Sequence, residues 1–201
     1  MKSVFKPGNS ILSEQILYIR ISEMKRIKLK DKSFSLMISS DEIAGGVVRV
    51  AESVNRDYCQ KNPLFICVLN GAFRFASDLV SEITGQCELT FVRLKSYNGT
   101  SSGGKVKMID ELNYEIKDRH VIIIEDIVDT GLTARALHEQ LRLKSPASIA
   151  IATLLFKPAA YCESLPIDYV GIEIPDNFIV GYGLDYCELG RNLNDLYIIE
   201  N

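Results

Sequence analysis

The sequence predicts an α/β fold in which a mainly parallel, twisted sheet is flanked by helices. Short apolar runs typical of buried strands alternate with segments of helical apolar spacing over residues 40–174. One such run, 121–124, leads into three carboxylates and a Thr-Gly-x-Thr turn before a helical pattern begins. Strands of a parallel sheet end in this way when they deliver polar groups to a ligand crevice.

The composition indicates one ordinary globular domain, with 201 residues, 47% of them apolar and 24% charged. A net charge of −3 argues against nucleic-acid binding through a basic surface, so any anionic ligand must be held by local groups and metal ions. The chain has no apolar run of membrane-spanning length, which predicts no membrane partner. Five widely spaced cysteines indicate a reducing compartment, and we expect the cytoplasm.

Residues 1–37 form a predicted N-terminal extension of mixed periodicity, in which the basic stretch 25–32 is expected to be solvated. Met24 is an alternative start, so residues 1–23 are expected to be dispensable. The first well-signalled helix begins after Ser39, because Ser39-x-x-Glu42 can form a capping box and apolar residues follow at helical spacing.

Further elements follow in order along the chain. The sequence predicts a strand over 63–69 ended by Asn-Gly, a helix over 73–83, a strand over 89–94, a strand over 121–125, a helix over 131–143, and strands over 148–156, 169–174 and 193–199. The stretch 96–108 is rich in Gly, Ser and Thr and is expected to be a mobile loop. Residues 175–201 are expected to form loops, turns and a returning strand.

Three carboxylates follow the strand 121–124, and their chemistry leaves two interpretations open. Glu125 and Asp126 can bind vicinal hydroxyls or a metal ion, and the turn after Asp129 can form an anion nest at the positive end of a helix. Alternatively, the carboxylates are a solvated strand end, with Asp129 or Thr130 as the helix N-cap.

The run 121–133 resembles the phosphoribosyl-diphosphate (PRPP) binding motif of the phosphoribosyltransferases. Four further segments resemble the hypoxanthine-guanine phosphoribosyltransferases in order and spacing, namely 68–73, 93–97, 154–158 and 175–186. The resemblance covers roughly residues 38–200. The PRPP motif identifies the superfamily, whereas the Lys-Pro and Pro-Asp-x-Phe elements identify its purine branch.

The resemblance implies a type I phosphoribosyltransferase fold with a small hood formed by terminal segments. It places the core at 38–174, a mobile lid at 96–108 and a purine-binding hood at 175–201. The implied activity is purine salvage: PRPP and hypoxanthine or guanine give IMP or GMP and pyrophosphate, with Mg²⁺. The resemblance also implies a homodimer or a homotetramer.

The resemblance assigns roles to the carboxylates and the turn. Asp129 is implied as the general base that exchanges a proton with purine N7. The implied PRPP-binding residues are Glu125, Asp126, Asp129, Thr130, Gly131, Leu132 and Thr133, of which the first two contact the ribose and the last four wrap the 5′-phosphate.

Three further sets complete the implied site. The pyrophosphate would be bound by Asn70, Gly71, Ser96, Tyr97 and Arg191. The purine would be bound by Lys157, Phe178, Ile179 and Asp185. The implied Mg²⁺ ligands are Glu125, Asp126 and Asp185. Many relatives carry Lys at the position of Asn70, and the resemblance implies a cis peptide before this residue.

Two alternatives to this activity remain at the level of the sequence. One is a xanthine-preferring phosphoribosyltransferase, because the contacts to the 2-position of the base are mostly backbone. The other is a non-catalytic regulator that keeps the PRPP fold, which a basic face would favour. The acidic balance of the chain does not favour that second alternative.

Overall fold

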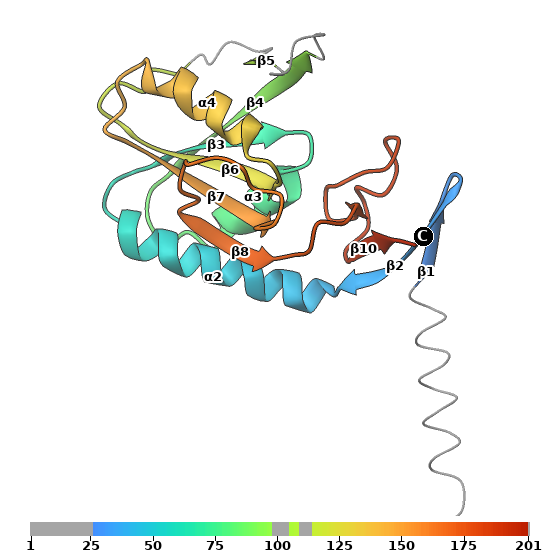
Figure 1. Cartoon of the computed structure of the whole chain (residues 1–201). Helices are drawn as coiled ribbons and strands as arrows, with labels where there is room; N and C mark the ends of the chain where they lie inside the picture. The colour runs from blue at the N-terminus through green and yellow to red at the C-terminus, as the bar shows by residue number, and fades with distance from the viewer. Residues whose placement is uncertain (1–25, 98–104, 109–113, 201) are drawn as a thin grey trace, which may run out of the picture.

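The computed structural model describes residues 26–97, 105–108 and 114–200 (Figure 1). The predictions for residues 1–23 lie outside these ranges. In chain order the elements are β1 (Arg26–Leu29), β2 (Lys32–Ile38), α2 (Ser40–Tyr58), β3 (Leu64–Leu69), α3 (Phe73–Ser81), β4 (Glu88–Tyr97), β5 (Lys105–Met108), β6 (His120–Val128), α4 (Leu132–Arg142), β7 (Ser148–Phe156), β8 (Tyr169–Glu173), β9 (Ile179–Val180) and β10 (Leu196–Ile199).

A six-stranded sheet forms the body of the molecule, in the order β5-β4-β3-β6-β7-β8. Its strands are parallel except β5, which runs antiparallel to β4. Side chains alternate between two cores: Phe65 and Cys67 face α2 and α3, whereas Leu64 and Ile66 face α4. The predicted mainly parallel sheet flanked by helices is therefore confirmed. No described helix is long and apolar enough to span a bilayer.

The helix α2 begins at the predicted capping box. The Ser39 hydroxyl accepts a hydrogen bond from the Glu42 backbone N–H at 3.3 Å, and Glu42 Oε2 accepts one from the Ser39 backbone N–H at 3.0 Å. The apolar face behind the cap, which includes Ile43, Val47 and Val50, is buried against the sheet. The start of the core is thus fixed by reciprocal hydrogen bonds and by burial.

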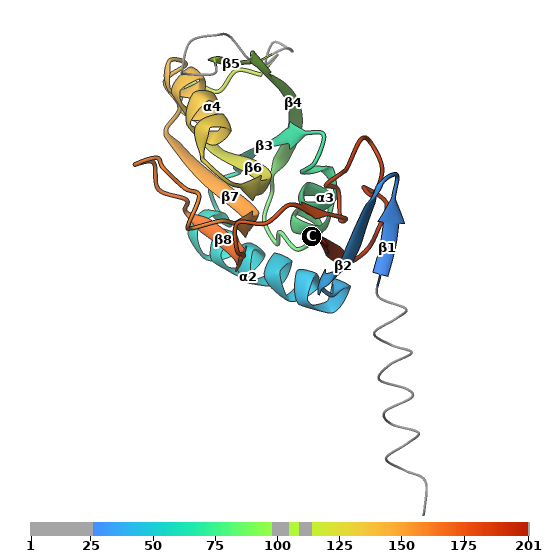
Figure 2. The same cartoon turned by 45° about the vertical axis from the view of Figure 1, so that its right-hand side comes forward.

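A second, four-stranded sheet has the order β1-β2-β10-β9 and forms the hood. It joins the segment 26–38 to the C-terminal strands, and Phe34, Val180 and Tyr197 form its small core. The expected hood from terminal segments is confirmed, but the basic stretch expected to be merely solvated contributes a strand. Figures 1 and 2 show that the hood faces the carboxyl ends of the strands β6, β7 and β8.

The stretch 96–108 is only partly the loop that its composition predicts. The strand β4 continues through Tyr97 and pairs with β5, with Ser96 opposite Val106 and Tyr97 opposite Lys105. Both ends of the predicted loop are therefore strands of a hairpin. Residues 98–104, between the two strands, lie outside the described residues.

The hood is tied to the main sheet by α3. The Arg74 guanidinium donates to the Leu193 carbonyl at 2.7 Å and to Asn194 Oδ1 at 3.0 Å. The same guanidinium lies 4.8 Å from the centre of the Tyr182 ring, and the Tyr182 hydroxyl donates to the Asp78 carboxylate. Two residues one turn apart on α3 thus contact both ends of the connection between β9 and β10, which we call the hood loop (181–195).

We expect Arg74→Met to lower the free energy of unfolding by about 1–3 kcal/mol, because it removes charge-assisted hydrogen bonds and a cation–π contact. Urea denaturation measures the change. The matched control is Arg56→Met: among the described residues Arg56 pairs only with the adjacent Asp57, at 3.2 Å on the surface of α2. That exposed pair contributes little, so equal losses in the two variants would contradict the proposed tie.

Candidate active site

Two adjoining cavities lie at the carboxyl end of β6, and the first of them is also lined by residues of the hood. The first has a volume of about 370 Å³ and is lined by Asn70, Gly71, Asp126, Ile127, Asp129, Lys157, Asn177, Phe178, Ile179, Leu184, Asp185 and Arg191. The second, of about 290 Å³, is lined by 125–131, Thr133 and Ala134. Asp126, Ile127 and Asp129 line both cavities, so the end of β6 forms their common wall.

The second cavity lies at the start of α4, and the structure corrects the predicted cap. Neither Asp129 nor Thr130 is the N-cap: Gly131 is, with φ of 86° and no side-chain hydrogen bond. A Cβ on Gly131 would lie 2.4 Å from the Tyr161 ring, so glycine is required there by space as well as by φ. The Leu132 N–H donates a long hydrogen bond of 3.5 Å to the Thr130 hydroxyl. No other described side chain caps the first turn of α4, so its remaining N–H groups are available to an anion.

Two neighbouring carboxylates, Glu125 and Asp126, line the second cavity, and Asp126 also lines the first. Glu125 is buried, and its Oε1 has no hydrogen-bond partner among the described residues. Burial, with a smaller contribution from Asp126, raises the pKa of Glu125 well above its usual range. Burial also raises the pKa of Asp126 to about 6. Asp126 Oδ1 accepts a hydrogen bond from the Ile127 N–H at 2.8 Å, so among the described residues it is Glu125 Oε1 that still lacks a partner.

The first cavity has a buried cation in its wall. The Lys157 side chain is only 8% exposed, and its Nζ donates to Asp129 Oδ2 at 2.9 Å and to Asp176 Oδ1 at 3.2 Å. The structure thus brings together two predicted site residues, Lys157 and Asp129. Sequence reasoning did not assign a role to Asp176, although this residue lies within the Pro-Asp-x-Phe element.

An exposed ring closes the hood side of the same cavity. Phe178 is 47% exposed, and its ring meets Tyr186 edge-on at 5.9 Å between centroids. Phe34 of β2 lies 6.4 Å away. Ile179 follows as a buried residue of β9 and also lines the cavity. Phe34 and Tyr186 thus pack against part of the Phe178 ring, and the rest of its surface stays exposed.

The loop after β3 meets the hood at this cavity. The Leu69–Asn70 peptide is cis, as the resemblance implies. Arg191 Nη1 donates to the Gly183 carbonyl at 2.9 Å, and Arg191 Nη2 pairs with Asp185 Oδ1 at 2.7 Å. Arg191 and Asp185, which were assigned to different ligands, are thus partners in the free protein.

The structure leaves two predictions for the site open. Ser96 and Tyr97 lie in β4, and their contact with pyrophosphate stays a prediction. The three carboxylates assigned to Mg²⁺ do not gather into a cluster: within residues 26–97, 105–108 and 114–200 no group of three or more His, Cys, Asp or Glu could hold a metal ion.

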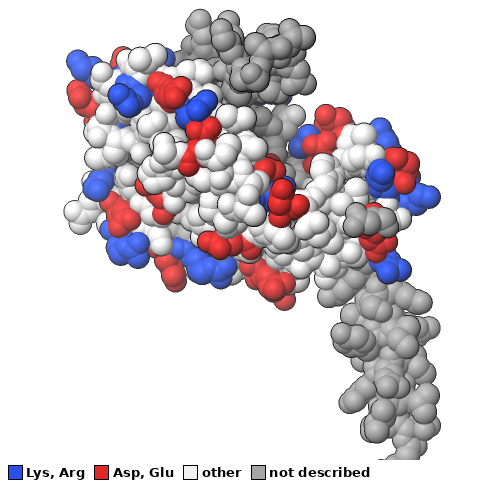
Figure 3. Space-filling view, in the orientation of Figure 1, with Lys and Arg blue, Asp and Glu red and all other residues white. Residues whose placement is uncertain are grey.

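Acidic and basic side chains are interspersed over the face of the molecule seen in Figure 3. The positive groups in the walls of the cavities are Lys157 and Arg191, together with the start of α4. Recognition of an anionic ligand at this site therefore depends on a few local groups.

Residues 39–187 match the family model of the phosphoribosyl transferase domain. A hypoxanthine-guanine phosphoribosyltransferase of Bacillus subtilis is 43% identical over 159 residues, which cover 79% of this chain and 88% of that protein. Two crystal structures are also similar. One is a hypoxanthine-guanine phosphoribosyltransferase of Bacillus anthracis, with a TM-score of 0.78 at 34% identity over 83% of this chain and 97% of that one. The other is a hypoxanthine phosphoribosyltransferase of Staphylococcus aureus. Its TM-score is 0.79 at 32% identity, over 90% of this chain and 95% of that one. With its parallel sheet, its hood and its paired cavities, the chain belongs to the hypoxanthine-guanine phosphoribosyltransferase family.

Proposed function

We propose that this protein transfers the 5-phosphoribosyl group from PRPP to hypoxanthine or guanine, giving IMP or GMP and pyrophosphate. The observation that carries the proposal is the pair of adjoining cavities with a shared wall of carboxylates. One cavity lies at an uncapped helix start, and the other lies between a buried lysine and an exposed ring. That arrangement suits a ligand in which a phosphate, a ribose and a base follow one another.

The phosphate and ribose belong at the second cavity. The turn Thr130–Thr133 and the free N–H groups at the start of α4 suit a 5′-phosphate. Leu132 itself does not line the cavity, and its half-exposed side chain has no part in the proposed contact. Glu125 and Asp126 accept hydrogen bonds from ribose hydroxyls, which supplies the partner that the buried Glu125 Oε1 lacks.

The purine belongs in the first cavity, between Phe178 and the end of β6. Lys157 donates to the 6-oxo group, whereas adenine carries an amino group there and offers no acceptor. Phe178 stacks on the base with the open part of its ring, and the Ile179 backbone reads its edge. Entry of the base replaces one carboxylate partner of Lys157 with a carbonyl oxygen.

Pyrophosphate belongs between the loop after β3 and the hood. The backbone of Asn70 and Gly71 lines this part of the cavity, and the Arg191 guanidinium can form paired hydrogen bonds to a phosphate. A backbone contact at Asn70 does not require the lysine that many relatives carry. Ser96 and Tyr97 would approach from the end of β4.

Mg²⁺ fits the donor set at the common wall. Asp126, with Glu125 beside it, offers hard oxygen ligands, and Mg²⁺ commonly binds one or two carboxylates and completes its shell with water and phosphate oxygens. Asp185 is a further candidate ligand once Arg191 turns to pyrophosphate. The bound ion supplies charge neutralisation between ribose hydroxyls and the leaving pyrophosphate.

The protein groups then act by positioning and by one proton transfer. Purine N9 bonds to the anomeric carbon as the bond to pyrophosphate breaks, and the purine loses its N7 proton to the Asp129 carboxylate. Asp129 suits this role because it faces both cavities and is held by Lys157. Loss of the proton leaves the nucleotide base neutral.

Turnover of hypoxanthine, guanine, xanthine and adenine with PRPP and Mg²⁺ tests the activity. We expect products with hypoxanthine or guanine and none with adenine, because Lys157 offers only donors to the 6-position. Liquid chromatography of the nucleotide products measures the outcome. A preference for xanthine would support the first alternative, and the absence of any product would support a non-catalytic role.

We expect Asp129→Asn to lower kcat by about 10²–10⁴-fold, because it removes the proton acceptor, while the PRPP dissociation constant changes far less. Steady-state kinetics and calorimetry measure the two effects. The control Asp176→Asn removes the other, longer ion pair of Lys157. Similar losses of kcat in both variants would show that Asp129 serves mainly to hold Lys157.

The raised pKa of Asp126 makes stability depend on pH. Its pKa is about 6 in the folded protein and 3.8 in the reference state, so the folded chain retains this proton longer. The free energy of unfolding therefore falls as pH rises from about 4 to 6, by up to about 3 kcal/mol.

We expect Asp126→Asn to remove this loss, so that the variant matches the wild type at pH 3.5 and exceeds it in stability above pH 6. Urea denaturation in the presence of a chelator, across this pH range, measures the difference. Asp118→Asn, at an exposed carboxylate that lines neither cavity, serves as the control. A gain at Asp126 that does not grow with pH would contradict the burial argument.

A further inference from the structure

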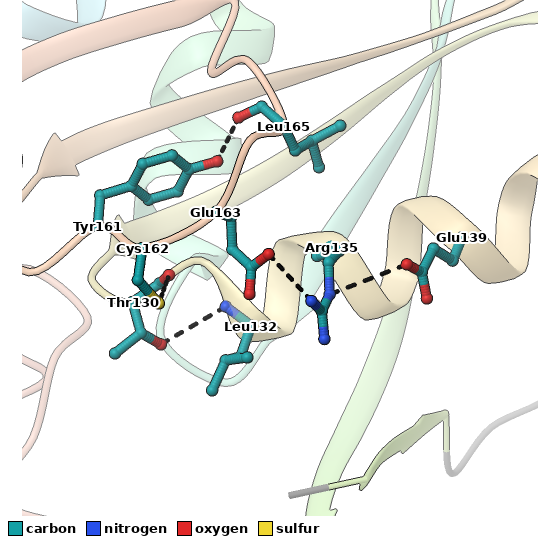
Figure 4. Close-up of polar contacts among 8 residues, drawn as sticks. All are labelled: Thr130, Leu132, Arg135, Glu139, Tyr161, Cys162, Glu163 and Leu165. Carbon is teal, nitrogen blue, oxygen red and sulfur yellow. Dashed lines mark hydrogen bonds and ion pairs between the residues drawn. The ribbon is translucent and has the colours of Figure 1, made fainter. Parts of the chain in front are cut away.

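The start of α4 packs against a segment that follows the purine-side lysine. This segment, Tyr161–Leu165, is defined here as the clamp segment and lies between β7 and β8. Figure 4 shows it along the N-terminal turn of α4, beside Thr130 and Leu132. No role has been given to its residues so far, although it contacts the loop to which the 5′-phosphate was assigned.

Backbone contacts join the clamp segment to the phosphate loop. The Cys162 N–H donates to the Thr130 carbonyl at 3.3 Å, and Cys162 Sγ lies 3.3 Å from the same oxygen. A Cβ on Gly131 would lie 2.4 Å from Tyr161 Cε2 and 3.0 Å from Glu163 Cγ. The clamp segment therefore forms the surface against which the Thr130–Gly131 peptide rests.

An ion pair adds a second connection. The Glu163 side chain is only 10% exposed, and its Oε2 lies 3.0 Å from Arg135 Nη1 (Figure 4). Arg135 belongs to the first turn of α4, and its backbone N–H donates to the Gly131 carbonyl at 2.9 Å. Because a carboxylate near a phosphate site would repel the ligand, Arg135 also neutralises the charge of Glu163.

The clamp segment is also tied to the purine side of the site. The Tyr161 N–H donates to the Lys157 carbonyl at 3.2 Å, and the Tyr161 hydroxyl donates to the Leu165 carbonyl. The Tyr161 ring meets Phe156, at the end of β7, at 5.3 Å between centroids. One short stretch of chain thus contacts both the phosphate loop and the backbone of the purine-side lysine.

We propose that Glu163 and Arg135 are positioning residues for the 5′-phosphate: their ion pair holds the clamp segment against Thr130–Gly131 and so fixes the loop in its binding conformation. This inference rests on the proposed function, because it takes that loop to be the phosphate site. Neither side chain needs to touch the ligand. Their effect is on the affinity for the phosphorylated sugar, and not on recognition of the base.

The test measures binding of ribose 5-phosphate by calorimetry, and turnover with PRPP and hypoxanthine, in variants of the full chain. We expect Glu163→Ala and Arg135→Ala each to raise the ribose 5-phosphate dissociation constant and the KM for PRPP about fivefold. The KM for hypoxanthine should change less than about twofold. Since the two residues act as a unit, the double variant should be no weaker than the weaker single variant.

A conservative variant and a matched control separate the positioning effect from poor folding. Glu163→Gln retains the shape and one hydrogen bond, so it should restore part of the loss even if Glu163→Ala folds poorly. The matched control is Glu139→Gln, which breaks the other ion pair of Arg135, at 3.8 Å between exposed side chains. This control should leave both constants unchanged.

Unchanged constants in Glu163→Ala, or tighter binding of ribose 5-phosphate, would overturn the inference, because a carboxylate that only repels phosphate improves the site when it is removed. Equal effects on the KM values of PRPP and hypoxanthine would also overturn it in favour of a general structural role. Wild-type protein that binds ribose 5-phosphate but turns over no base would instead refute the proposed function and leave the positioning effect measurable.

Discussion

The site depends on the close approach of three chain segments at two glycines. A Cβ on Gly71 would lie 1.5 Å from Asp126 Oδ2, and a Cβ on Gly183 would lie 2.2 Å from the Gly71 carbonyl oxygen. The loop after β3, the carboxylate at the end of β6 and the hood loop can therefore meet only where side chains are missing. Any side chain at Gly71 would displace the carboxylate that forms the common wall of the cavities. The hood would likewise separate from the sheet if position 183 carried a side chain, and the first cavity would lose its enclosure.

Both cations of the site are already paired in the free protein. Lys157 lies between two carboxylates, and Arg191 pairs with Asp185 and, at 3.3 Å, with Glu188. A buried ammonium group without such partners would be costly, so pairing makes its position tenable. Ligand binding at this site is therefore an exchange of partners. Under the proposed function, the carboxylates released by a ligand would become available for a metal ion or a proton.

Local signals predicted much of the fold and of the site. The capping box located the start of α2, and the apolar run 148–156 coincides with β7. Other features depend on contacts between distant segments, which no local pattern reveals. The strands β1 and β2 are polar on one side and gain their partners only in the hood. The cap of α4 was misassigned because Gly131 is required by Tyr161, a residue thirty positions later. Asp176 was missed because its partner Lys157 lies nineteen residues earlier, just after β7.

The strand order of the hood has a consequence for synthesis on the ribosome. The strand β2 emerges early, but its inner neighbour is β10, and the Ser40 N–H donates to a carboxylate, that of Asp195, 155 residues further along. The main sheet needs no hood strand, so β3, β6 and β7 can assemble first during translation. The strands β1 and β2 can pair with each other at once, but the other edge of β2 stays unpaired until β10 arrives, at the entropic cost of closing a very long loop. The first cavity is consequently enclosed late in folding, and the nascent chain carries an open strand edge until then.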